Sequence, residues 1–68
     1  METDVVSEVV TRVLVELLAN GEWKPFGSLA ALAVAKTAFS EGAVNMEITR
    51  GLTTGQFVRN GTQIRLRD

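Results

Sequence analysis

The fold of this chain is decided by residues 57–67, which read Phe-Val-Arg-Asn-Gly-Thr-Gln-Ile-Arg-Leu-Arg. Asn60-Gly61 separates two runs that favour β-strands, and Asn-Gly is the strongest short-range hairpin signal because both positions of its tight turn need a positive φ. A two-residue loop at this point pairs Arg59 with Thr62. The sequence therefore predicts a C-terminal antiparallel hairpin. Its core face carries Phe57, Ile64 and Leu66.

Two helices are predicted before the hairpin. Residues 4–19 carry apolar side chains in pairs that recur every four positions, and Asn20-Gly21 stops the helix. Residues 28–40 are rich in alanine and begin at Ser28, a favoured N-cap residue. The apolar surface of the first helix is wider than its own domain requires, so part of it is expected to contact a protein partner or a second copy of the chain. The residues assigned to this interface are Val5, Val9, Leu14 and Val15.

Residues 43–52 permit two interpretations. The alternation of apolar and polar residues from Val44 to Ile48 is typical of a half-buried strand. However, Val44, Ile48 and Leu52 also recur every four positions, as on one face of a short helix. Gly51 and the β-branched residues favour the strand. We therefore prefer a strand here, with the helix as the alternative.

These elements predict one small α+β domain over residues 1–68. Two N-terminal helices pack on a C-terminal antiparallel β-hairpin, or on a three-stranded meander whose third strand is residues 43–49. If residues 43–52 are helical instead, the fold becomes winged-helix-like.

The residue inventory argues against an enzyme. The 68 residues contain no histidine, cysteine or tyrosine, which excludes Ser-His-Asp and Cys-His nucleophiles and ordinary zinc sites. The glycines form no phosphate-cradling pattern, so no cofactor or metal is expected. The chain has no signal-peptide pattern and no uncharged run long enough to cross a bilayer. We expect a soluble cytoplasmic protein without a membrane partner.

Charge is distributed unevenly along the chain. Residues 1–47 carry seven acidic and three basic side chains, a net charge of −4, whereas residues 48–68 carry four arginines and one aspartate, a net charge of +3. This split indicates a basic contact surface for nucleic acid or an acidic partner, or arginines that only solvate the hairpin. The arginines concerned are Arg50, Arg59, Arg65 and Arg67.

The spacing of the elements supports one family resemblance. A helix leads into Leu17-Leu18-Ala19-Asn20-Gly21-Glu22-Trp23, a second helix starts at Ser28, and Leu52, Gly55, Phe57-Val58-Arg59, Gly61, Ile64 and Leu66 follow. Over residues 12–68 this pattern resembles the winged-helix DNA-binding domains. The resemblance implies that residues 43–52 are the recognition helix and that residues 59–62 are the tip of the wing. It also implies that the four arginines contact phosphate.

Two functions therefore fit the sequence. The first is a non-catalytic binding protein that acts through protein–protein contacts and self-associates through its first helix. The alternative is a winged-helix-like regulator that binds duplex DNA with its arginine-bearing hairpin. The secondary structure of residues 43–52 separates them, because the hairpin can be a wing only if a helix precedes it.

Overall fold

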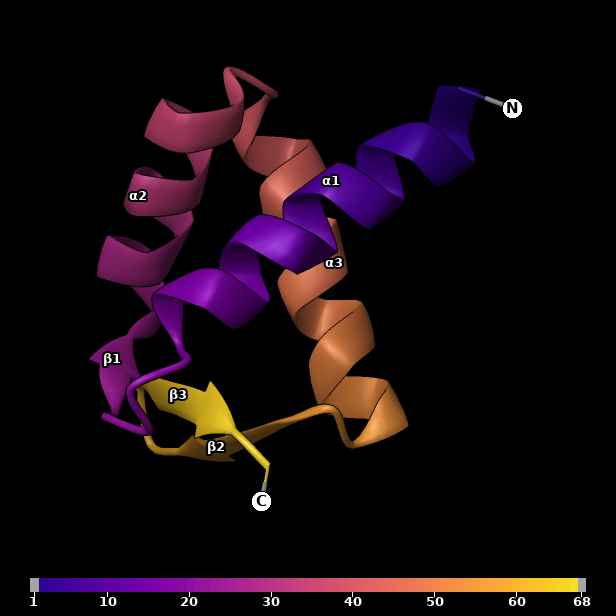
Figure 1. Ribbon diagram of the computed structural model, residues 1–68. Coiled ribbons are helices and arrows are strands. Elements are labelled where there is room, and N and C mark those ends of the chain that lie inside the picture. Colours follow the sequence, from indigo (N-terminus) through magenta and orange to yellow (C-terminus); the bar gives the residue numbers. More distant parts are fainter. Residues whose placement is uncertain (1, 68) are drawn as a thin grey trace.

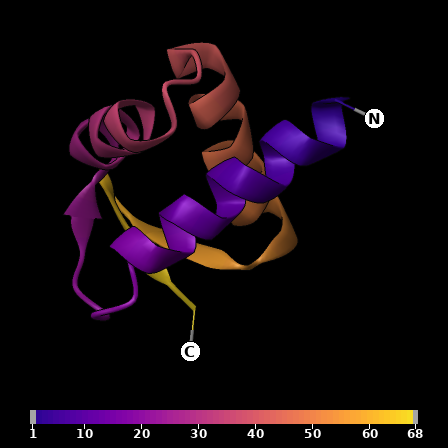
Figure 2. The same cartoon turned by 45° about the horizontal axis from the view of Figure 1, so that its top comes forward.

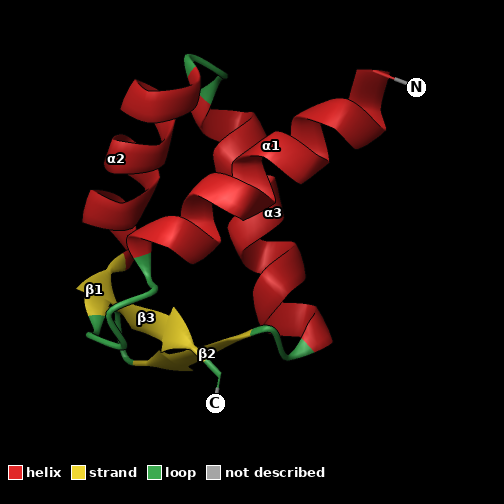
Figure 3. Cartoon of the chain, in the orientation of Figure 1, coloured by secondary structure: helices red, strands yellow, loops and turns green. Residues whose placement is uncertain are grey.

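The computed structural model describes residues 2–67 and the side chains of residues 5–67. This part of the chain forms a small α+β domain of three helices and one three-stranded antiparallel sheet (Figures 1 and 3). The expected packing of helices on a C-terminal hairpin is confirmed at this level. The elements in chain order are α1 (Glu2–Leu17), β1 (Lys24–Pro25), α2 (Phe26–Thr37), α3 (Glu41–Thr54), β2 (Phe57–Asn60) and β3 (Gln63–Leu66).

Residues 43–52 lie within α3, so the preferred strand is wrong and the helical alternative is correct. On a strand, Val44, Met46 and Ile48 would all point to one face. Instead Val44 and Ile48 are fully buried while Met46 is 62% exposed. The side chains follow the helical period of 3.6, because one face of this segment packs against α1 and α2.

The helix boundaries shift by a few residues from those predicted. The second helix begins at Phe26, with Pro25 rather than Ser28 at its N-cap. It ends where Ala38 adopts a left-handed φ of 60° and donates its N–H to the carbonyl of Val34 at 2.8 Å. Ser40 then caps α3, and its hydroxyl accepts the N–H of Ala43 at 3.2 Å. Ser40 was predicted to be the last residue of the second helix. In the structure it is instead the residue that caps the start of a third helix.

The sheet has the strand order β1-β3-β2, with every neighbouring pair antiparallel. Its third strand is β1, not residues 43–49, so the expected meander is wrong. The two residues of β1 pair with β3 through Lys24 opposite Ile64. They form no pattern of their own in the sequence, because a strand of this length has no period to detect. The strand β2 lies at the edge of the sheet nearest α3.

The hairpin forms as predicted, but its register differs. Asn60 pairs with Gln63, which leaves Gly61-Thr62 rather than Asn60-Gly61 as the loop. Of these loop residues only Gly61 has a positive φ, 64°, which is the requirement of a type II′ turn. Each residue of β2 therefore pairs with a residue two positions further along β3 than predicted. Because side chains alternate between the two faces of a sheet, a shift of two positions leaves every side chain on its predicted face. Phe57 consequently remains on the core side, now opposite Leu66.

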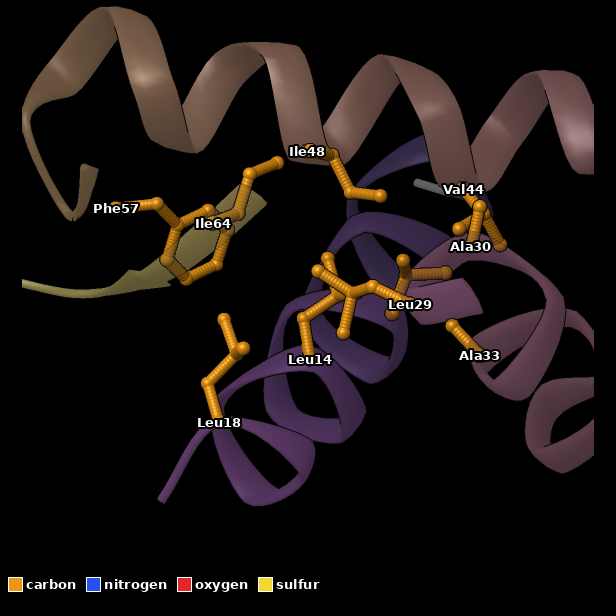
Figure 4. Close-up of a cluster of buried hydrophobic side chains, with 10 residues drawn as sticks. Leu14, Leu18, Leu29, Ala30, Ala33, Val44, Ile48, Phe57 and Ile64 are labelled. Carbon is orange, nitrogen blue, oxygen red and sulfur yellow. The ribbon is translucent and has the colours of Figure 1, made fainter. Parts of the chain in front are cut away.

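The core lies where the three helices meet the inner face of the hairpin, and side chains from all of these elements point toward one another (Figure 4). Gly51 of α3 faces the ring of Phe57 so closely that a Cβ added there would overlap ring atoms. The close approach of helix and hairpin therefore depends on a residue without a side chain. The buried hydrophobic residues are Val10, Leu14, Leu18, Leu29, Ala30, Ala33, Val44, Ile48, Phe57 and Ile64.

Candidate nucleic-acid interface

The four predicted contact arginines fall into three different environments. Arg59 and Arg67 line the same hollow, next to the end of α3. Arg50 is directed toward α1, and Arg65 lies over an aromatic ring. The structure therefore brings together two of the four arginines.

The hollow of Arg59 and Arg67 lies between the C-terminal end of α3 and the edge strand β2, and has a volume of about 450 Å³. Gly55 shapes it, because this residue ends α3 with a φ of 86° and turns the chain into β2. The chain after β3 is fixed beside it by the N–H of Arg67, which donates to the carbonyl of Gln56 at 3.1 Å. Two arginines that line one open hollow suit an anion such as a phosphate. The lining residues are Leu52, Gly55, Phe57, Val58, Arg59 and Arg67.

Arg50 belongs to a polar network that joins α1 to α3. Its Nη1 donates to Ser7 Oγ at 3.1 Å, and Ser7 donates in turn to Glu47 Oε1 at 2.9 Å. Glu47 is only 7% exposed, and the same Nη1 of Arg50 lies 3.7 Å from its carboxylate. A buried carboxylate requires such partners, since removal from water without them is costly. Arg50 therefore neutralises Glu47, which reduces the positive charge that it offers to an external ligand.

Arg65 contacts Trp23, in the segment that leads into β1. Its guanidinium carbon lies 5.0 Å from the centroid of the indole ring, within the range of a cation–π contact. No local sequence pattern predicts this contact, because the two residues are brought together by the β1–β3 pairing. This contact ties the hairpin to the segment before α2 and places Arg65 apart from the hollow of Arg59 and Arg67.

The outward face of α3 carries an uncharged stripe beside the exposed Arg50. Gly42, Met46, Thr49 and Thr53 are all exposed and lie at helical spacing, opposite the buried Val44-Ile48-Gly51 side. We refer to Met46, Thr49 and Thr53 as the α3 stripe. Methyl and hydroxyl groups of this kind can contact base edges in the major groove. Sequence reasoning missed the stripe because residues 43–52 were interpreted as a strand.

A second hollow, of about 390 Å³, lies between α2 and the N-terminal end of α3. Its walls are largely apolar, from Phe26 along Ala30 and Val34, and among the described residues that line it Glu41 alone is charged. Asn45 also lines it, and its Oδ1 is buried without a hydrogen-bond partner in the described part of the chain. A hollow with a carboxylate and no base repels phosphate. The arginine-lined hollow is therefore the better candidate for an anion.

The residues predicted as a protein interface on α1 separate into two groups. Leu14 is fully buried in the core, and Val15 is partly buried against it. Val5 and Val9 lie on the other side of the helix and are 55% and 37% exposed. Of the four residues predicted to form the interface, only Val5 and Val9 have side chains that a partner could contact.

Comparisons with protein-family models, with curated proteins and with solved structures find no match to this chain. Among the helices that the structure describes, none has the length and apolar character needed to cross a membrane. The described residues also contain no group of three or more acidic, histidine or cysteine side chains that could hold a metal ion.

Proposed function

We propose that this chain is a non-catalytic DNA-binding domain of the winged-helix type. In this proposal α3 enters the major groove of duplex DNA through the α3 stripe. The β2–β3 hairpin is the wing, and the hollow of Arg59 and Arg67 receives a backbone phosphate. The observation that carries the proposal is the helical state of residues 43–52, which places an exposed helix directly before an arginine-bearing hairpin.

The arrangement of the elements supports this proposal. The helix α2 is joined to α3 by a three-residue turn, and α3 leads through a two-residue turn into the hairpin. A second helix that follows a short turn is the element that helix-turn-helix proteins insert into the major groove. The exposed α3 stripe carries no acidic residue that would repel DNA. Its groups contact bases, while Arg59 and Arg67 supply the phosphate contacts that fix the position of the domain.

The charge of the chain predicts weak binding. Its formal net charge is −1. In addition, Arg50, one of the four arginines predicted to contact phosphate, is partly neutralised by Glu47. Affinity for DNA backbone depends on the number of phosphates that basic side chains neutralise. We therefore expect a single domain to bind with a dissociation constant on the order of micromolar or weaker at physiological salt, as non-specific binders do.

The hairpin arginines provide the first test. We expect Arg59→Ala to weaken binding to a fluorescent DNA duplex and to lower the slope of log K against log salt by about 1, and Arg59→Ala/Arg67→Ala to lower it by about 2. Binding is measured by fluorescence anisotropy over a series of salt concentrations. The expected loss is similar for different sequences, because phosphate contacts carry little sequence information.

The matched control is Lys36→Ala, which removes one positive charge from the last turn of α2. This position lies at the opposite end of the molecule from the hairpin (Figure 1). The control should leave the salt slope close to that of the wild type. Equal effects of Arg59→Ala and Lys36→Ala would assign the binding to overall charge, and absence of salt-sensitive binding at millimolar protein would reject the proposal.

A further inference from the structure

We propose that the exposed face of α1 is a second functional surface, which pairs in an antiparallel arrangement with the same face of α1 in a second copy of the chain. The surface consists of Val5, Glu8, Val9, Arg12 and Glu16, which we refer to as the α1 stripe. This inference concerns a different face from the DNA-binding proposal and does not depend on it.

The α1 stripe has the composition of a small contact surface. Its two valines are exposed, although the same helix contributes Val10 and Leu14 to the core. The N-terminal end of α1 extends beyond α3 in both views (Figures 1 and 2). Apolar side chains on a projecting helix are accessible to another helix without rearrangement of the fold.

The charged residues of the stripe are available for contacts outside the domain. Glu8 and Arg12 are exposed, and neither side chain forms a hydrogen bond or ion pair with another described residue. They lie one helical turn apart, both on the same flank of Val9. The stripe is therefore apolar in part, and it carries opposite charges that no other element of the described domain neutralises.

The order of these charges selects the partner and its orientation. In a two-fold pair, residue i of one copy contacts residue j of the other and the reverse. An antiparallel pair centred on the level of Val10 brings each Glu8 next to Arg12 of the partner subunit, which gives two complementary contacts. A parallel pair would instead place like charges opposite each other, which is repulsive.

The composition of the stripe also disfavours nucleic acid as its occupant. Glu8 and Glu16 outnumber Arg12, so the surface is acidic overall and repels phosphate. A self-complementary surface requires no additional partner. A second copy of the chain is therefore the occupant that the charges favour.

The test is a charge exchange across the pair. Sedimentation equilibrium at micromolar to millimolar concentration should show a reversible dimer for the wild type. Glu8→Arg and Arg12→Glu should each weaken association on the order of tenfold or more, because each places like charges together at two symmetric contacts. The double variant Glu8→Arg/Arg12→Glu should restore association to near the wild-type level. Helical content is checked by circular dichroism for all variants.

Two further variants make the outcome unambiguous. Val9→Lys should abolish the dimer, whereas Arg59→Ala should leave it unchanged because the hairpin lies outside the α1 stripe. A monomeric wild type at millimolar concentration would overturn the inference. Failure of the double variant to recover association, with all variants folded, would overturn the antiparallel pairing. A wild-type protein that dimerises but does not bind DNA would reject only the proposed function.

Discussion

Replacement of Gly51 by alanine is expected to destabilise the domain strongly. A Cβ at this position would overlap the ring of Phe57, which is buried between α3 and the rest of the core. Overpacking of a filled core costs about 1–3 kcal/mol. A domain of this size is expected to have only about 3–5 kcal/mol of stability. The substitution should therefore remove a large part of it, although alanine is the better helix former.

The matched control is Gly42→Ala in the first turn of the same helix. Gly42 is exposed, and the nearest atom to an added Cβ is Ser40 Oγ at 4.0 Å. Alanine should stabilise α3 there by up to about 1 kcal/mol. Urea unfolding followed by circular dichroism measures both variants. Phe57→Leu in the Gly51→Ala background should recover part of the loss, and similar unfolding midpoints for the two glycine variants would contradict the close packing of α3 on Phe57.

The second large effect is expected at Leu14. This side chain is fully buried among residues from the other helices and the sheet (Figure 4). Leu14→Ala should cost about 2–5 kcal/mol, since it removes apolar contacts and leaves a cavity. Val9→Ala, five residues earlier on the exposed side, should change the free energy of unfolding by no more than about 0.5 kcal/mol.

Both variants are measured by urea unfolding at low micromolar protein, where self-association contributes least. The comparison separates the two faces of α1, which the sequence pattern joined in one interface. A large loss for Val9→Ala, or a small loss for Leu14→Ala, would contradict the orientation of α1 in the structure. The result also decides which residues can be changed to study an interface without unfolding the domain.

The hairpin was predictable from sequence in its essentials. Alternation along a strand has a period of two, so Phe57 and Ile64 are assigned to the core whether the loop is Asn60-Gly61 or Gly61-Thr62. The register was not predictable, because Gly61 can serve as the second residue of one turn type or the first of another. The predicted hairpin and its core face are therefore correct, although the predicted pairing of residues across the hairpin is wrong.

Residues 43–52 show where sequence reasoning fails. Six residues of alternating polarity match a strand, but Val44 and Ile48 also match a helix, and the two periods coincide at every fourth residue. What decides between them is packing against α1 and α2, together with the cap at Ser40. The cap was the available signal, since serine followed by an acidic residue is typical of a helix start.

The candidate site was only partly predictable. The sequence indicates how many arginines lie near the C-terminus but not which ones are engaged within the domain. Arg50 contacts Ser7 across 43 residues of chain, and Arg65 lies over Trp23. Such long-range contacts leave no local pattern in the sequence. The hollow of Arg59 and Arg67 is likewise formed by elements that meet only in the folded domain.

The central claim is that α3 and the hairpin contact DNA together. The most direct test is to titrate isotope-labelled protein with a short DNA duplex and follow the backbone amide chemical shifts by NMR. We expect the largest changes at Met46, Thr49, Thr53 and Arg59, with smaller changes at Glu8 and Val9 on the opposite side of the domain. Chemical-shift changes confined to α1, or no chemical-shift changes at millimolar DNA and low salt, would contradict the claim that α3 and the hairpin contact DNA together.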